Sequence, residues 1–322
     1  MSESATRAAA WLPQRLMAPL LVAAVIALAP LAFSSGYHFR IGALVSINAL
    51  AVIGLNILMG LAGQVSLGHA AFFGIGAYAV AILPAQFGID PIVSAIVGAF
   101  VCAAVAIATG RTILRLKGHY LAVATLGLGM LVAMVLNNEL WLTGGPDGMA
   151  AARPEIGGWR ARSSEAWYWI SGACLVIGIV LAENLRASSV GLALGALHDS
   201  EVAASVLGVD VARAKLAAFV VSAVYGSVAG SLLGFLNGRV TPDRAGFLQS
   251  IEFATMAVLG GLGSMVGSVV GAAVLVVLPQ VLTLFHEYEH LMLGLLIIVI
   301  MIVLPSGVVP TLLDRIARRP GK

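Results

Sequence analysis

Charged residues are scarce in this 322-residue chain. Asp, Glu, Lys and Arg make up only 10% of it, whereas soluble globular domains have roughly a quarter. Hydrophobic residues make up 60% and the mean hydropathy is +1.01. These figures exclude a soluble globular protein. They also exclude disordered, collagen-like and coiled-coil proteins, because each needs abundant charge, a strict glycine repeat or heptads. The composition therefore predicts an all-α integral membrane protein.

Several chemical motifs are also missing. The two cysteines, Cys102 and Cys174, lie in apolar segments with no Cys or His at ligand spacing, so neither a disulfide framework nor a zinc site is indicated. There is no Gly-x-x-x-x-Gly-Lys-Ser/Thr loop to hold ATP phosphates. Paired catalytic carboxylates and nucleophile-base arrangements are lacking as well. We expect no cofactor or metal on this chain and no enzymatic activity of its own.

What the sequence does contain is long charge-free runs, and a bilayer crossing needs about 20 apolar residues. Six runs have the length of single crossings: Leu16–Tyr37, Pro91–Gly110, Gly118–Asn138, Ala166–Ala182, Leu216–Gly238 and Leu291–Leu313. Two more, residues 41–89 and 253–285, are too long for one helix and must turn back.

Each long run contains a glycine-rich break, at residues 60–68 and 260–264. Splitting the chain there predicts helices at 41–60, 66–88, 246–262 and 264–285. The total becomes about ten transmembrane helices, with two glycine-broken segments, in a single membrane domain covering residues 1–322.

The basic residues indicate the orientation, because cytoplasmic loops are enriched in Lys and Arg. With a cytoplasmic N-terminus, 12 of the 18 Lys and Arg residues lie inside and 6 outside. Residues 1–15, 183–215 and 314–322 are then cytoplasmic, and residues 141–165 form an external loop.

The two breaks predict the translocation path, since non-helical backbone is tolerated at membrane depth only beside protein or a watery cavity. The candidates are the glycines of the breaks and the polar side chains around them: Asn48, Asn56, Gly60, Gly63, Gln64, Ser66, His69, Glu252, Thr255, Gly260, Gly261 and Gly263. The alternatives are structural: a hydrogen-bonded core histidine at His69, and a Glu252 that lies near the outer interface or pairs with Arg239 or Arg244.

A second candidate region is a short helix in the cytoplasmic stretch 183–215. Asp199 or Ser200 can cap it, Glu201 lies in its first turn, and Gly208 can end it in a left-handed conformation. Ala203 and Ala204 lie in its middle. We expect this helix to have nothing to pack against in its own chain; the alternative is an ordinary loop helix.

Four sequence elements together resemble a known family. Glu201-x-Ala-Ala-x-x-x-Gly208 is similar to the Glu-Ala-Ala loop of ABC-importer permeases. Residues 60–78, Thr143–Gly148 and Leu259–Ser264 resemble LivM-type permease subunits of branched-chain amino acid importers.

The resemblance implies a coupling helix, with Asp199, Ser200, Glu201, Ala203, Ala204 and Gly208, that docks on an ATPase. The implied partners are a second homologous permease subunit, two cytoplasmic ATPase subunits that use ATP and magnesium, an external solute-binding protein, and the bacterial inner membrane. Branched-chain or other hydrophobic amino acids are the expected cargo. Alternatives are urea, short amides or aromatic acids, or a proton-coupled carrier in which His69 and Glu252 titrate.

Overall fold

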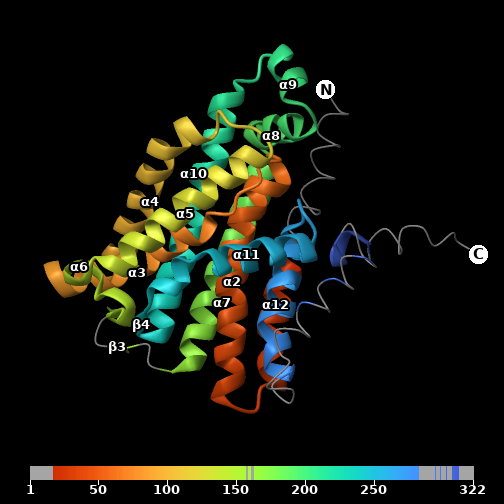
Figure 1. The fold of residues 1–322 in the computed structure, drawn as a ribbon. Helices are drawn as coiled ribbons and strands as arrows, with labels where there is room; N and C mark the ends of the chain where they lie inside the picture. Colours follow the sequence, from red (N-terminus) through yellow and green to blue (C-terminus); the bar gives the residue numbers. More distant parts are fainter. Residues whose placement is uncertain are drawn as a thin grey trace, which may run out of the picture.

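The chain forms a bundle of helices in the computed structural model (Figure 1). The structure describes residues 17–156, 159–160 and 163–282, together with 294, 298, 302 and 307–311. The predicted segments 1–15 and 314–322, and most of Leu291–Leu313, lie outside these residues.

The helices and strands follow in chain order, after a first apolar helix, Met17–Leu31. They are η1 Ala29–Ala32, α2 Gly36–Asn56, η2 Ile57–Leu61, α3 His69–Phe87, α4 Pro91–Ile113, α5 His119–Asn138, α6 Leu140–Thr143, η3 Gly145–Asp147, β1 Met149–Ala150, β2 Glu155–Ile156, β3 Trp159–Arg160, α7 Ser164–Arg186, α8 Ser189–Asp199, α9 Glu201–Val206, α10 Val211–Asn237, β4 Arg239–Val240, η4 Pro242–Ala245, α11 Phe247–Gly260 and α12 Met265–Leu282.

Six described helical segments are long and apolar enough to cross a bilayer: Gly36–Leu61, His69–Phe87, Pro91–Ile113, His119–Asn138, Ser164–Arg186 and Val211–Asn237. Three shorter apolar helices are Met17–Leu31, Phe247–Gly260 and Met265–Gln280. The protein is therefore a multi-pass, essentially all-helical membrane protein. The count of ten is not confirmed, because α11 has 14 residues, about 21 Å, and does not span 30 Å alone.

The bundle has two ends, which we call the α9 end, where α8 and α9 lie, and the loop end, where β1 to β4 lie (Figure 1). At the loop end, the Arg40 guanidinium donates to the Asn237 side-chain oxygen at 2.9 Å, and the Tyr37 hydroxyl donates to Gln280. The start of α2 thus meets the ends of α10 and α12. The chain between them, which includes α11 and α12, leaves the loop end and returns to it.

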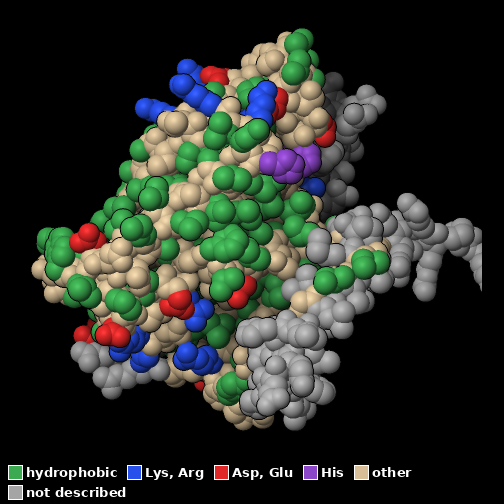
Figure 2. All heavy atoms as spheres, viewed as in Figure 1, with side chains coloured by type: hydrophobic (Ala, Val, Ile, Leu, Met, Phe, Trp, Pro, Cys, Tyr) green, Lys and Arg blue, Asp and Glu red, His purple; other side chains and the backbone are tan. Residues whose placement is uncertain are grey.

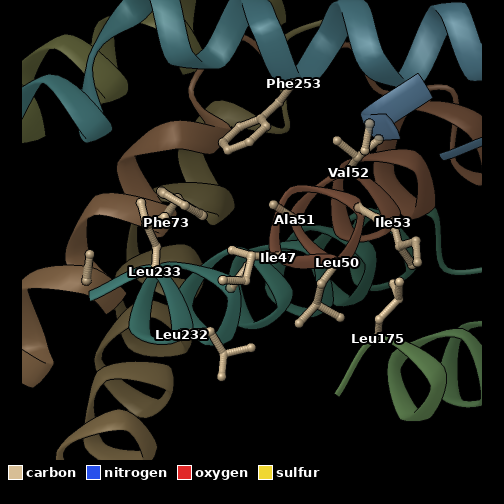
Figure 3. Packing of buried hydrophobic residues seen from close by; sticks show 14 of the residues in the cluster. Ile47, Leu50, Ala51, Val52, Ile53, Phe73, Leu175, Leu232, Leu233 and Phe253 are labelled. Atoms are coloured by element: carbon tan, nitrogen blue, oxygen red, sulfur yellow. The ribbon is translucent and has the colours of Figure 1, made fainter. Parts of the chain in front are cut away.

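The core is built around α2 and α10. About 70% of the apolar window is buried in each of these helices, against 22% in α4 and α5. Figure 3 shows Ile47 and Leu50 of α2 packed among side chains of α3, α7, α10 and α11, including Phe73, Leu175 and Phe253. Deep burial of α2 fits its low charge, because Arg40 is its only Asp, Glu, Lys or Arg residue.

Small residues allow α3 and α10 to pack closely. A side chain at Gly230 would collide with the backbone carbonyl of Phe73, and one at Gly226 would meet His69 and Phe72. Gly226, Gly230 and Gly234 of α10 therefore form a packing seam against α3, as small residues do at many membrane helix contacts.

The outer flank of the bundle is apolar, with large exposed side chains such as Phe100, Val123, Leu131 and Ile177. Figure 2 shows charged side chains gathered toward the two ends, with a broad uncharged belt between them. This is the surface expected of a protein with lipid as its lateral solvent.

Candidate functional site

The two glycine-rich breaks meet through one side chain, Asn56. Its amide donates to the Ser264 carbonyl at 3.0 Å, to the Ser268 hydroxyl at 2.8 Å and to the Gly261 carbonyl at 3.4 Å. Its oxygen accepts from the Gly263 amide at 2.7 Å. Asn56 is fully buried, so it satisfies the unwound backbone of the second break from within α2.

The first break begins later than predicted. The chain stays helical through Gly60 in a π turn, with the Ala62 amide bonded to the Ile57 carbonyl at 3.3 Å, and α3 starts at His69 rather than at residue 66. A side chain at Gly60 would overlap Asn56 and the backbone of Gly263. Gly60 is thus required for close approach of the breaks, and single π turns are frequent at functional sites.

The first break also reaches the stretch 183–215 that the sequence predicts to be cytoplasmic. Gly63 has a φ of +65°, and a Cβ built there would lie 3.1 Å from Nδ1 of His198 in α8. One continuous set of contacts therefore runs from α8, through Gly63 and Gly60, to the turn between α11 and α12.

The predicted path residues divide into two groups. Asn56, Gln64, Ser66 and His69 are buried inside this chain. Gly260 and Gly261 are buried as well. The other predicted residues are partly accessible, namely Asn48, Gly60, Thr255 and Gly263, or exposed, namely Gly63 and Glu252. Only the second group is accessible from outside this chain.

His69 is a hydrogen-bonded core residue. Its Nε2 lies 2.9 Å from the Ala51 carbonyl, and its Nδ1 lies 3.2 Å from the Ser222 hydroxyl. Since a carbonyl only accepts, Nε2 carries the proton and Nδ1 accepts from Ser222. Both ring nitrogens are engaged, as in the structural alternative for this residue.

A cavity of about 430 Å³ lies at the loop end, between α2, α10, α11 and α12. Its polar lining residues are Arg40, Asn48, Asn237, Arg244, Gln249 and Glu252. Arg40 and Asn48 are eight residues apart, so the cavity reaches about 12 Å along α2. Its volume is in the range of small-molecule sites.

Glu252 is tied to an arginine indirectly. The Gln249 amide donates to Glu252 Oε2 at 2.9 Å, and Arg244 donates to the Gln249 oxygen at 3.4 Å. Arg239, the other suggested partner, donates instead to the Asp147 carbonyl. Gln249 and Arg40 were not among the predicted site residues, although their position beside the charge-free runs was a usable signal.

The short helix α9 has the predicted ends, and of the two suggested capping residues Ser200 is the one that caps it. Ser200 is the cap and accepts from the Ala203 amide at 3.3 Å, while Asp199 is the last residue of α8. Gly208 has a φ of +85°, which is the left-handed conformation expected of it.

The expectation that α9 packs against nothing in its own chain is wrong. Ala204 is fully buried, so it faces the bundle rather than water. Glu201 bonds to Lys215 of α10 and lies 3.3 Å from Lys117 in the turn before α5. These contacts hold α9 against α10 and the turn before α5.

Glu201 lies outside the membrane-spanning segments, and its partner Lys215, near the start of α10, is poorly accessible, with only 4% of its side chain exposed. Partial burial raises the pKa of Glu201, but hydrogen bonds and charge from Lys215 and Lys117 outweigh it, and the pKa falls below 4.5. The carboxylate is ionised at neutral pH.

The outer face of α9 is apolar and exposed. Val202 is 70% exposed, Val206 81% and Leu207 78%. Ala203 lies on this side too. These exposed apolar side chains, beyond the spanning helices, form a candidate contact surface.

Comparison with known proteins identifies relatives over most of the chain. Residues 37–301 match the family described as branched-chain amino acid transport system, permease component. The chain is 32% identical to the high-affinity branched-chain amino acid transport system permease protein LivM of Salmonella typhimurium, over 94% of this chain and 77% of that protein. It is also 32% identical to LivM of Escherichia coli, over 84% of this chain and 69% of that protein. The high-affinity branched-chain amino acid transport system permease protein LivH of Salmonella typhimurium is 28% identical to it, over 82% of this chain and 91% of LivH. No solved structure matches the chain significantly.

Proposed function

Because the chain belongs to the family of permease components of branched-chain amino acid transport systems, we propose that it forms part of the pore of an ATP-driven importer for branched-chain or other hydrophobic amino acids. It acts as a transport subunit rather than an enzyme. ATP and magnesium are used by separate subunits.

Similarity to both LivM and LivH supports a heterodimeric pore. Two differently named permease proteins of one transport system are both related to this chain. A second homologous permease therefore completes the pore, with two ATPase subunits at the α9 end and a solute-binding protein at the loop end.

The charge distribution supports this orientation in the bacterial inner membrane, with both termini cytoplasmic. Six basic residues gather at the α9 end: Arg111, Arg115, Lys117, Arg186, Arg213 and Lys215. The loop end has five among the described residues, Arg40, Arg153, Arg160, Arg239 and Arg244. The orientation therefore rests on the whole sequence, in which 12 of the 18 Lys and Arg residues lie on the side assigned to the cytoplasm.

The observation that carries the proposal is the exposed apolar face of α9, formed by Val202, Val206 and Leu207. Ser200 and Gly208 define the ends of this helix, and the Glu201–Lys215 pair joins it to α10. A helix fixed in this way transmits a displacement of a bound ATPase subunit to the bundle, which a flexible linker would absorb.

The test is Val206→Arg, because a long charged side chain on this face would be buried without a partner on ATPase docking. Such a charge costs several kcal/mol, enough to weaken a subunit contact by orders of magnitude, about tenfold per 1.4 kcal/mol. We expect normal membrane insertion, loss of the ATPase subunits during purification, and loss of ATP-dependent leucine uptake in vesicles.

The matched control is Ala85→Arg, which adds the same side chain to an exposed position at the loop end. It should retain the ATPase subunits. Wild-type ATPase binding by Val206→Arg would contradict the coupling role of α9.

A proton-coupled carrier is disfavoured by His69, whose two ring nitrogens are both bonded inside the chain. A group that relays protons along a path must contact water or another titratable group. His69 contacts a carbonyl and a hydroxyl.

A further inference from the structure

The wall of the cavity at the loop end has charges of both signs, three side-chain amides and an apolar remainder. Arg40 comes from α2, Arg244 from η4 and Glu252 from α11. The cavity thus contains two cations and one anion that belong to three separate elements.

The hydrogen bonds of these groups leave capacity for a ligand. A guanidinium has five N–H donors, and the Asn237 oxygen takes one from Arg40. The Glu252 carboxylate accepts from the neutral Gln249 amide, and no ion pair joins it to a basic residue in the described part of the chain. Glu252 is also exposed, so an ammonium group can approach it.

The remaining lining is apolar. Leu44, Phe73, Leu233, Met256, Leu275 and Val276 surround the polar groups. A branched aliphatic side chain removed from water gains about 25 cal/mol per Å² on such a surface, whereas a polar or charged side chain would lose its hydration.

We propose that this cavity is an intramembrane binding site for a zwitterionic amino acid with an apolar side chain. Arg40 and Arg244 bind the carboxylate, Glu252 binds the ammonium group, and the apolar wall receives the side chain. The proposal rests on the proposed function and names the cargo subsite within it. Urea and short amides lack both charges, and aromatic acids lack the ammonium group, so the cavity favours amino acids over these alternatives.

The test measures ligand protection of a cysteine on the cavity wall. Leu44→Cys is made in a chain in which Cys102 and Cys174 are replaced by Ala, and the intact transporter complex is placed in lipid nanodiscs without binding protein. Alkylation of position 44 by a maleimide is followed with three probes: leucine, 4-methylpentanoate, which lacks the ammonium group, and isoamylamine, which lacks the carboxylate.

We expect leucine to protect position 44 at lower concentration than either analogue. Glu252→Gln should raise the half-protecting leucine concentration about tenfold, since a charge-assisted hydrogen bond is lost, and should leave 4-methylpentanoate unchanged. Arg40→Gln should weaken protection by both leucine and 4-methylpentanoate, since both carry the carboxylate. The controls Glu165→Gln and Arg153→Gln, which alter exposed charges outside the cavity, should change neither.

Uptake by the wild-type complex is measured separately. If ATP-dependent leucine uptake proceeds but leucine does not protect position 44, the cavity is not the subsite, while the proposed function stands. Unchanged leucine protection in Glu252→Gln would also overturn the proposal. Absence of branched-chain amino acid uptake would refute the proposed function, and the protection assay would still decide whether the cavity binds a zwitterion.

Discussion

At the scale of single residues, Asn56 holds the two breaks together with bonds to the turn between α11 and α12. Asn56→Ala would leave buried backbone and hydroxyl groups unpaired, at about 1–3 kcal/mol each. We expect a lower melting temperature of the purified protein and loss of uptake.

Asn48→Ala is the matched control, because the Asn48 amide donates only within α2, to the Leu44 carbonyl at 2.8 Å. It should melt close to the wild type. A wild-type melting temperature for Asn56→Ala would mean that the breaks do not depend on this side chain.

Residue type and spacing predicted which polar side chains matter, but not what they contact. Asn56 was identified because a polar amide in an apolar run needs a partner. Its partner Ser268 was not, because the two are 212 positions apart and only the tertiary fold joins them. Ala204 was placed in water, since alanine fits either face of a short helix and only the bonding of Glu201 fixes the rotation.

At the scale of elements, α9 depends on the Glu201–Lys215 pair. The pKa of Glu201 is depressed, so the pair stabilises α9 above the ordinary carboxyl pKa of 4.5 and is lost as pH falls through the lower, folded-state value. Hydrogen exchange of α9 amides, corrected for intrinsic rates, should be constant from neutral pH to about 4.5 and rise only below it.

Glu201→Gln should show faster exchange throughout that range, because Lys215 is left buried without its anionic partner. The matched variant Asp210→Asn removes an exposed acid paired with the exposed Arg213 at 2.9 Å. Exposed pairs contribute little, so it should leave α9 exchange unchanged. If Glu201→Gln also matches the wild type, the pair does not hold the helix.

The ends of α9 were predictable because capping is local: Ser200 and Gly208 act on backbone within three residues. The π turn at Ile57–Leu61 was not. It is stabilised by contact of Gly60 with the second break, which no window of sequence around residue 60 contains.

At the scale of the whole molecule, the proposed orientation rests on the division of the 18 Lys and Arg residues, 12 of which lie on the side assigned to the cytoplasm. In a chain with Cys102 and Cys174 replaced by Ala, an impermeant maleimide should label Arg153→Cys in intact cells. It should label His119→Cys only after the membrane is permeabilised. Both positions are exposed; labelling of His119→Cys alone in intact cells would invert the assignment.

The fold class and most helices were predictable from charge-free runs, because burial in lipid forces backbone bonding within each helix. The exact number of crossings was not. Apolar length alone does not distinguish a full span from a short helix such as α11. The backbone that follows α11 is hydrogen-bonded by Asn56 of α2.

The dependence of the α11–α12 turn on Asn56 has a consequence for biogenesis. A nascent α11–α12 segment that enters the bilayer alone would expose the unpaired backbone of Gly261–Ser264 to hydrocarbon. Because α2 emerges from the ribosome some 200 residues earlier, its helix is already in the membrane when this segment arrives. The segment can then insert directly against α2, because the order of synthesis places Asn56 in the membrane before the turn that it bonds.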